Sequence, residues 1–246
     1  MELIGVGRMA EVYAVGNDTV LKLDRVEFNG AAEHEAVILR EVARAGLPVP
    51  HVVETVMVDG RHGIVMEQLH GPLLTELIRT GGGLGDLAEK FVELHTSMHA
   101  FVAPSAPDLI ERLAAEIERS DLPVATRTDL VACLRRNDGA TGLCHFDFHA
   151  DNVIVTESGW KVIDWLTAAS GPPIADFARS LLLRADSTDD HSVEFMTHVR
   201  RHGIRRRELN PDEIDAWTRI VAAARLSEGF TGDYSSRLRT IALNGA

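Results

Sequence analysis

The stretch HFDFHADNVIVTESGWKVID, residues 145–164, decides the fold of this chain. It places Asp147 in a loop, followed by one apolar run from Val153 and a second apolar run that ends at Asp164. We interpret the two runs as a β-hairpin with a three-residue turn, Glu157-Ser158-Gly159, because turns of this length commonly need glycine.

This hairpin would bring two oxygen-bearing side chains together. Folding it about Ser158 sets Asn152 opposite Asp164. Directly opposed residues have Cβ atoms about 4.5–5.5 Å apart, so an amide and a carboxylate can share one ion. Mg²⁺ suits this pair, since it keeps several waters and shares oxygens with substrate phosphates. The sequence therefore predicts a metal site at Asn152 and Asp164, with Asp147 as a neighbouring base.

The N-terminal residues predict a second part of the same site. Gly5 and Gly7 lie in a loop between two expected strands, and folding the next hairpin about Asn17 puts Lys22 opposite Val12. Glycine lets a backbone approach phosphate oxygens closely, and the lysine ammonium supplies a point charge. The glycine loop alone is weak evidence, because turns use glycine freely.

A lysine on the interior face of a strand needs a partner. The helix expected at 31–45 offers Glu33 and Glu35. We favour Glu35, because the packed face of this helix runs through Ala36, and we keep Glu33 as the fallback. The alternative for either glutamate is a solvated helix face.

The remaining patterns predict a two-lobed α+β architecture, with a small strand-rich lobe at 1–70 and a larger helical lobe at 71–246. The expected strands are 2–4, 10–15, 19–24, 51–58 and 63–69, besides the hairpin at 153–163. The expected helices are 31–45, 73–79, 86–102, 107–119, 126–137, 174–185, 190–202 and 211–229. The glycine-rich run at 81–85 follows a helix and has no Lys-Ser/Thr, so we expect a connection there.

Composition narrows the classes of function. The 246 residues are 45% hydrophobic and 25% charged, and 25 Lys+Arg against 37 Asp+Glu give a net charge of −12. This mix is typical of a soluble globular chain, and its acidity disfavours nucleic acids and anionic membranes as partners. Two cysteines and the absence of a long apolar run predict a cytoplasmic protein with reduced thiols.

Taken together, these motifs resemble the aminoglycoside-phosphotransferase-like branch of the protein-kinase-like fold. The resemblance is carried by Gly5–Val12, Lys22, Glu35, HFDFHADN at 145–152 and VIDW at 162–165. AGLPVP at 45–50, VMEQLHG at 65–71, LHTSMHA at 94–100 and the stretch through Asp176-Phe177-Ala178 are similar as well. The resemblance thus spans nearly the whole chain.

For the catalytic loop, the resemblance implies that Asp147 accepts a proton from a substrate hydroxyl. It also implies that Asn152 and Asp164 hold Mg²⁺. The chain departs from the family pattern at Phe146, where glycine is usual, and at Ala150, where a proline-like residue is usual. Neither departure removes a ligand or the base.

For the nucleotide, the resemblance implies that Lys22 contacts the α- and β-phosphates of ATP and that Glu35 holds Lys22. The backbone of Glu67, Gln68 and Leu69 would form the hinge that hydrogen-bonds adenine.

We expect structural roles for three histidines and keep two alternatives for a fourth. His95 and His99 are spaced to present two imidazoles to zinc, but Thr96 stands where a metalloprotease motif has glutamate, so we expect a structural role beneath the catalytic loop. We expect His145 to support the loop backbone. For His149, contact with phosphate or metal-bound water and a structural role both stay open.

The predicted function is an ATP-dependent kinase for a hydroxyl group of a small molecule. The net charge, together with Glu228 and Asp233, hints at a cationic acceptor such as an aminoglycoside, an amino sugar or an amino alcohol. The alternatives are a nucleotide-binding pseudokinase and a protein kinase. Only eleven residues separate Asp164 from Asp176, which is short for the activation segment of a protein kinase. The sequence does not indicate an oligomeric state.

Overall fold

The computed structural model describes residues 1–136, 139–183 and 189–244, and it divides into two compact units. Unit 1 comprises Met1–Leu77, Ala103–Ser105 and Ala150–Ala168. Unit 2 comprises Ile78–Val102, Ala106–His149 and Ala169–Ala246. Residues 137, 184 and 185 of two predicted helices lie outside the described residues.

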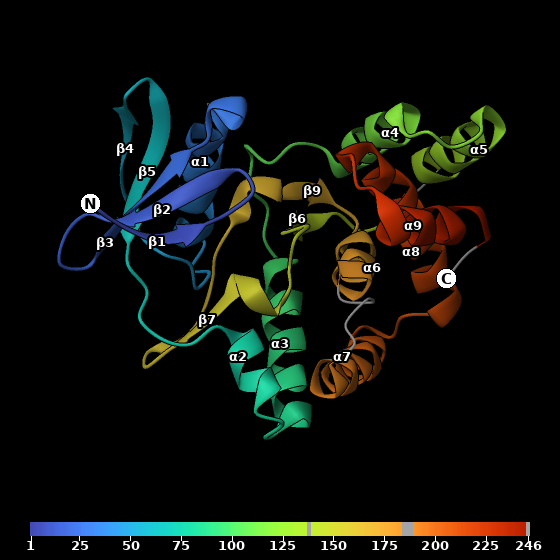
Figure 1. Cartoon of the computed structure of the whole chain (residues 1–246). Coiled ribbons are helices and arrows are strands. Elements are labelled where there is room, and N and C mark those ends of the chain that lie inside the picture. Colours follow the sequence, from blue (N-terminus) through green and yellow to red (C-terminus); the bar gives the residue numbers. More distant parts are fainter. Residues whose placement is uncertain (137–138, 184–188, 245–246) are drawn as a thin grey trace. The chain divides into compact units, whose positions relative to one another are not determined.

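Unit 1 contains a five-stranded antiparallel sheet with the strand order β1-β2-β3-β5-β4 (Figure 1). The strands are β1 (Glu2–Val6), β2 (Ala10–Ala14), β3 (Thr19–Asp24), β4 (Val52–Val58) and β5 (Arg61–Glu67). Helix α1 (Ala31–Arg44) packs against β3, β4 and β5. Its buried residues recur at helical spacing, as a helix that covers one face of a sheet requires: Ala32, Glu35, Ala36, Ile38, Leu39 and Val42.

The register of the N-terminal hairpin confirms one prediction. Val12 of β2 pairs with Lys22 of β3, and Gly5 of β1 pairs with Val12 from the other side. The turn between β2 and β3 is closed by a hydrogen bond from the Val15 N–H to the Thr19 carbonyl, 3.1 Å long. Gly5, Val12 and Lys22 therefore lie side by side on three neighbouring strands.

The register predicted for the second hairpin was wrong by one residue. Strands β7 (Val153–Thr156) and β8 (Gly159–Val162) pair Val153 with Val162 and Thr156 with Gly159, which leaves a two-residue turn. Gly159 is the first residue of β8, with φ of 125°, rather than the last residue of the turn. The Thr156 hydroxyl closes the turn through a 2.7 Å hydrogen bond to the Gly159 carbonyl.

Unit 2 is mainly helical. Helix α2 (Leu74–Arg79) continues from unit 1 into unit 2. The further α-helices of unit 2, among the described residues, are α3 (Leu84–Met98), α4 (Leu109–Arg119), α5 (Val124–Arg135), α6 (Pro173–Leu183), α7 (Asp190–Arg207), α8 (Pro211–Arg225) and α9 (Gly232–Asn244). Short strands β6 (Gly142–Cys144) and β9 (Ala169–Gly171) pair with each other. The sequence analysis predicted neither α9 nor this strand pair.

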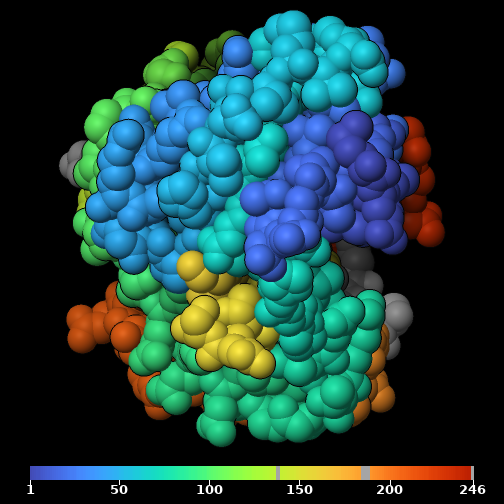
Figure 2. Space-filling model, turned by 90° about the vertical axis from the view of Figure 1, so that its left-hand side faces the viewer, coloured from blue at the N-terminus to red at the C-terminus, as the bar shows by residue number. Residues whose placement is uncertain are grey.

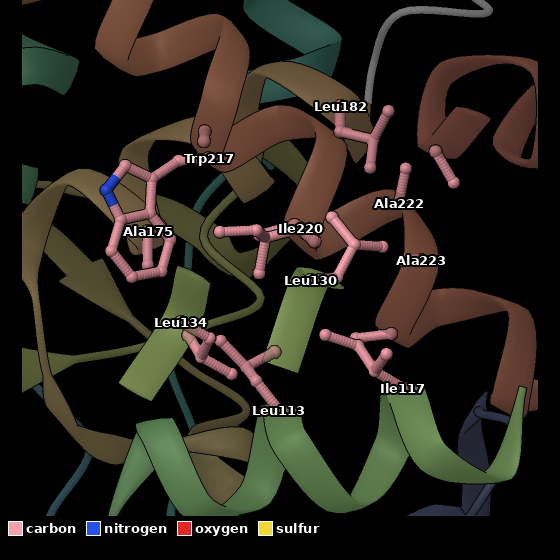
Figure 3. Packing of buried hydrophobic residues seen from close by; sticks show 14 of the residues in the cluster. Leu113, Ile117, Leu130, Leu134, Ala175, Leu182, Trp217, Ile220, Ala222 and Ala223 are labelled. Atoms are coloured by element: carbon pink, nitrogen blue, oxygen red, sulfur yellow. The ribbon is translucent and has the colours of Figure 1, made fainter. Parts of the chain in front are cut away.

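The core of unit 2 lies where α4, α5, α6 and α8 meet (Figure 3). Leu113 and Ile117 of α4 point toward Leu130 of α5 and Ile220 of α8 in the same view, and all four are at most 5% exposed. Burial of each such side chain stabilises the fold by about 1.5–3 kcal/mol. This core anchors α6, which supports the loop described below. Within the described part of the chain, no helix has the length and apolarity needed to cross a membrane.

Candidate active site

A partly buried lysine in unit 1 pairs with two carboxylates. The ammonium of Lys22 lies 2.6 Å from Oε2 of Glu35 and 2.9 Å from Oδ1 of Asp164. The side chains of Lys22 and Glu35 are 14% and 2% exposed, whereas that of Asp164 is 45% exposed. The predicted partner is therefore Glu35, whereas Glu33 pairs with His62 on the exposed side of α1.

Glu35 also holds the segment that carries Asp164. Its second oxygen, Oε1, accepts the backbone N–H of Trp165 at 3.1 Å. The ring of Trp165 is fully buried, and its Nε1–H donates to the Val162 carbonyl at 3.1 Å. One carboxylate thus fixes both the lysine and the residue that follows Asp164.

The charges in this cluster keep the lysine ionised. Burial lowers the pKa of Lys22, but the negative charges of Glu35 and Asp164 outweigh it and raise the pKa above its ordinary value. The ammonium stays a fixed positive charge with one exposed neighbour, Asp164. Such a charge can bind an anionic oxygen that displaces part of the Asp164 contact.

The two predicted metal ligands flank the open end of the β7–β8 hairpin. The Ile163 N–H donates to the Asn152 carbonyl at 3.0 Å, so Asn152 stands opposite Ile163 and the predicted pairing of Asn152 with Asp164 was wrong. Asp164 follows directly, with a left-handed φ of 63° that takes it out of the strand. The side chain of Asn152 is buried and that of Asp164 is accessible. An amide and a carboxylate oxygen are hard donors that fit Mg²⁺ or Ca²⁺.

The glycine loop before β2 is internally bonded. The Gly7 N–H donates to the Ala10 carbonyl at 2.8 Å, and the Arg25 Nε–H donates to the Gly7 carbonyl at 3.1 Å. Gly5 was predicted to lie in this loop, but it belongs to β1 and pairs with Val12. A Cβ on Gly5 would lie 3.4 Å from the Cβ of Val12, which shows how closely the two strands approach there.

The predicted hinge residues follow β5. The N–H groups of Glu67 and Gln68 donate to the carbonyls of His51 and Asp18, both at 2.9 Å. Residues 67–72 and the tip of the β7–β8 hairpin, yellow in Figure 2, border a surface cavity of about 620 Å³. Its lining, as far as the described residues show, includes Glu67, Gln68 and Leu69 but neither Lys22 nor Val12.

In unit 2, Asp147 lies in the loop that follows β6. Its carboxylate oxygen Oδ2 is 3.6 Å from Nε2 of His149, and its side chain is 26% exposed. Burial raises the pKa of Asp147, but the hydrogen bond and charge of His149 outweigh it, with help from Arg179, and hold the pKa below its ordinary value. The carboxylate is therefore ionised and can accept a hydrogen bond from an alcohol.

A buried carboxylate on α6 holds the backbone just before Asp147. Asp176 accepts the N–H of His145 at 2.9 Å and the N–H of Phe146 at 2.8 Å. Nε2 of His95 and Nε2 of His99 both lie 3.0 Å from Oδ2 of the same carboxylate. Burial lowers the pKa of His95 to about 3 against the opposing charge of Asp176, so the ring is neutral.

Among the described residues, His95, His99 and Asp176 also have ligand atoms close enough to hold a metal ion. Both carboxylate oxygens already accept backbone N–H groups, and His95 stacks on Phe148 with ring centroids 4.5 Å apart. We assign this cluster to support of the loop that carries Asp147. His145 also has a backbone contact, since its Nδ1 lies 3.3 Å from the N–H of Asp147.

Arg179 was not predicted from the sequence to support this site. This residue of α6 is 6% exposed and donates from Nη1 to Oε1 of Glu228 at 3.0 Å. Glu228 also lies 3.7 Å from Nη2 of Arg225. The hint of a cationic acceptor rested partly on Glu228, and that carboxylate is already paired with two buried guanidiniums. An arginine within the apolar face of α6, between Ala178 and Leu182, was the signal that could have revealed this cluster.

Comparison with known proteins gives the family. The family model "Phosphotransferase enzyme family" matches residues 1–219. The chain belongs to this family. No curated protein is significantly similar to this phosphotransferase in sequence.

Solved structures share the protein-kinase-like fold of the phosphotransferase. A thermostable mutant of an aminoglycoside phosphotransferase has a TM-score of 0.71 at 16% identity, covering 96% of this chain and 90% of that one. An amicoumacin kinase, in complex with AMP-PNP, Ca²⁺ and amicoumacin, has a TM-score of 0.67 at 16% identity, covering 97% and 86%. A choline/ethanolamine kinase family protein from Mesorhizobium loti has a TM-score of 0.64 at 16% identity, covering 96% and 83%.

Proposed function

We propose that this phosphotransferase moves the γ-phosphoryl group of MgATP to a hydroxyl group of a small molecule. The observation that carries the proposal is the ion-paired Lys22, held between Glu35 and the accessible carboxylate of Asp164. The motif HFDFHADN, which contains Asp147 and Asn152, supports it from the sequence. Phosphoryl transfer passes through a loose transition state, so positioning and charge neutralisation do most of the catalytic work.

In this proposal Asp147 is the catalytic base. Its ionised carboxylate orients the acceptor hydroxyl and takes the proton as the new O–P bond forms and the bond from the γ-phosphorus to the bridging oxygen breaks, which releases ADP. Asn152 and Asp164 would hold the divalent cation, which neutralises charge on the phosphates when bound. The ammonium of Lys22 would bind oxygens of the α- and β-phosphates.

The hinge proposal follows from the hydrogen bonds already made. The N–H groups of Glu67 and Gln68 donate within the protein. We therefore propose that the Leu69 N–H donates a hydrogen bond to adenine. Backbone carbonyls of residues 67–69 would accept hydrogen bonds from adenine. The neighbouring structure with AMP-PNP and Ca²⁺ is consistent with a nucleotide and a divalent ion as cofactors.

For the acceptor we propose a hydroxylated amine, such as an aminoglycoside, an amino sugar or an amino alcohol. The net charge of −12 and the names of similar structures support this class. Glu228 adds no support, because it is paired with Arg179 and Arg225. Free thiols at Cys133 and Cys144 fit a reducing compartment, and we propose that the enzyme works in the cytoplasm.

The test is an acceptor screen with MgATP, in which mass spectrometry detects the gain of one phosphoryl group. Hydroxylated amines, neutral sugars and hydroxy acids form the panel, and the Asp147→Asn variant is the control. A product that forms with the wild-type chain and falls about 10²–10⁴-fold with the variant supports the proposal. A chain that binds ATP but modifies no acceptor and hydrolyses no ATP would instead be a pseudokinase.

A further inference from the structure

The backbone next to the proposed base is strained. Phe146 has a φ of 61°, in the left-handed region that favours glycine. Its side chain is bulky and 1% exposed, and a bulky residue in this conformation needs support from its surroundings. Because Phe146 directly precedes Asp147, whatever fixes this conformation also fixes the direction in which the loop presents the carboxylate.

Two guanidiniums hold the ring of Phe146. The Cζ of Arg112 lies 4.6 Å from the ring centroid, and the Cζ of Arg179 lies 4.7 Å from it. Both distances fall within the range of cation–π attraction, which strengthens when the groups are removed from water. The hydrogen bond from the Phe146 N–H to Asp176 holds the backbone, so ring and backbone are both restrained.

Arg179 is itself held in place. Its Nη1 donates to Glu228 at 3.0 Å, and its side chain is 7% exposed. Arg179 and Asp176 are three residues apart on α6, so one helix supplies both the contact to the ring and the contact to the backbone. Arg112 comes from α4 and is 23% exposed, which makes it the more solvated of the two.

We propose that Arg179 is a positioning residue for the catalytic loop: oriented by Glu228, its guanidinium holds the ring of Phe146 and thereby the strained backbone that presents Asp147. This inference rests on the proposed function, since it assigns Arg179 to the same reaction. Arg179 also helps by its charge to hold the pKa of Asp147 low, an effect that Arg179→Lys would keep. It acts through Phe146, and its flat guanidinium, not its charge alone, is the feature required.

The test is a double-mutant cycle with Arg179→Met and Phe146→Leu, read by two measurements. The first is the equilibrium constant for unfolding in urea. The second is the steady-state hydrolysis of MgATP, which uses water as the acceptor. Leucine keeps apolar bulk but offers no ring, so both single variants remove the contact between Arg179 and the ring. Phe146→Leu also removes the Arg112 contact, and Arg179→Met also removes the ion pair with Glu228, so the coupling in the cycle isolates the contact that both variants share.

We expect the two substitutions to be coupled: the effect of the double variant on the unfolding constant should differ by at least about threefold from the product of the two single effects. We expect kcat to fall about 10–100-fold in either single variant with KM for ATP unchanged, and the double variant to be no worse than the poorer single one. Arg179→Lys keeps the charge and the ion pair with Glu228, and we expect it to stay impaired. If it restores full turnover, or if the effects of Arg179→Met and Phe146→Leu simply add, the inference is overturned.

A matched control is Arg207→Met. Arg207 lies over a different ring, that of Phe177, at 5.0 Å. We expect its effect on unfolding to add to that of Phe146→Leu. If Arg179→Met does not fold, Arg179→Lys takes its place in the cycle. A wild-type chain without MgATP hydrolysis contradicts the proposed function, whereas the unfolding cycle still decides whether Arg179 and Phe146 are coupled.

Discussion

Glu35 and Lys22 form a partly buried ion pair of 2.6 Å, and the second oxygen of the carboxylate contacts another element. That oxygen accepts the backbone N–H of Trp165, the residue after Asp164. A single side chain of α1 therefore sets the position of the lysine and of the segment that carries the accessible carboxylate. Every proposed nucleotide contact of Lys22 and Asp164 depends on this arrangement.

The first prediction concerns this carboxylate. In Glu35→Gln the buried ammonium of Lys22 loses its closest counter-charge and shifts toward Asp164. We expect kcat/KM for ATP to fall about 10–100-fold. Removing one partner of a buried ion pair costs about 3–5 kcal/mol, and relaxation of the neighbouring side chains recovers part of this free energy. Steady-state hydrolysis of MgATP measures the change.

The same helix offers a matched control. Glu33 is 60% exposed and pairs with His62 at 2.9 Å, away from the lysine. Glu33→Gln should leave kcat/KM for ATP nearly unchanged, since exposed ion pairs contribute about 0–1 kcal/mol. Equal losses in the two variants would show that Glu35 has no special role.

The second prediction concerns pH. Asp147 must be ionised to accept a proton, and His149 lowers its pKa against the effect of burial. In His149→Gln the pKa of Asp147 rises, so the acid limb of the kcat/KM profile moves to higher pH. Because the wild-type pKa is below the ordinary carboxyl value, the wild-type acid limb lies below pH 4, and profiles of MgATP hydrolysis between pH 4 and 8 should show this limb in His149→Gln. His34→Gln, at an exposed position on α1, is the control, and an acid limb that stays in place in His149→Gln rejects the role of His149.

The third prediction concerns the cation. In Asp164→Ala the only carboxylate of the proposed ligand pair is lost. Titration calorimetry with AMP-PNP should then give the same affinity with and without Mg²⁺, whereas the wild-type chain should bind more tightly with Mg²⁺. Asn152→Ala should weaken this Mg²⁺ effect less, because a neutral amide contributes less charge than a carboxylate. An undiminished Mg²⁺ effect in Asp164→Ala contradicts the metal assignment.

The sequence was sufficient for features that depend on local patterns. The turn chemistry between Ala14 and Thr19 predicted the pairing of Val12 with Lys22, and helical periodicity selected Glu35 over Glu33. The predicted register of the second hairpin was wrong because Gly159 can either end a three-residue turn or begin a strand. The choice between them depended on the hydroxyl of Thr156, whose hydrogen bond to Gly159 no pattern encodes.

Other features depend on contacts between distant segments. Strands β6 and β9 have three residues each, too few for a period-2 pattern. In α9 only Leu238, Ile241 and Ala242 are buried, so its apolar stripe is weak. The support of Phe146 by Arg179 joins positions 33 residues apart, and its importance follows from a backbone angle that sequence spacing does not reveal.

The last prediction concerns the acid stability of the fold. His95 is fully buried, and its pKa in the folded chain is lowered to about 3. In the unfolded chain the imidazole has its ordinary pKa of about 6.5, so between these two values only the unfolded chain binds the proton. Stability is therefore complete above pH 6.5 and falls as pH drops toward 3, by up to about 1.4 kcal/mol per pH unit for this group. The pKa of Asp176 is also lowered, but its contribution is lost only below the ordinary carboxyl range of about 3.9.

Between about pH 4 and 6.5 His95 therefore contributes an increase of the free energy of unfolding with pH. In His95→Gln the free energy of unfolding in urea should lose about one proton's worth of pH dependence over this window, while the value at pH 7.5 falls because a buried stacked ring is removed. His34→Gln, at an exposed site, should keep the wild-type slope. A His95→Gln slope equal to that of the wild type would mean that His95 is protonated in the folded chain and that Asp176 binds an imidazolium instead of a neutral ring.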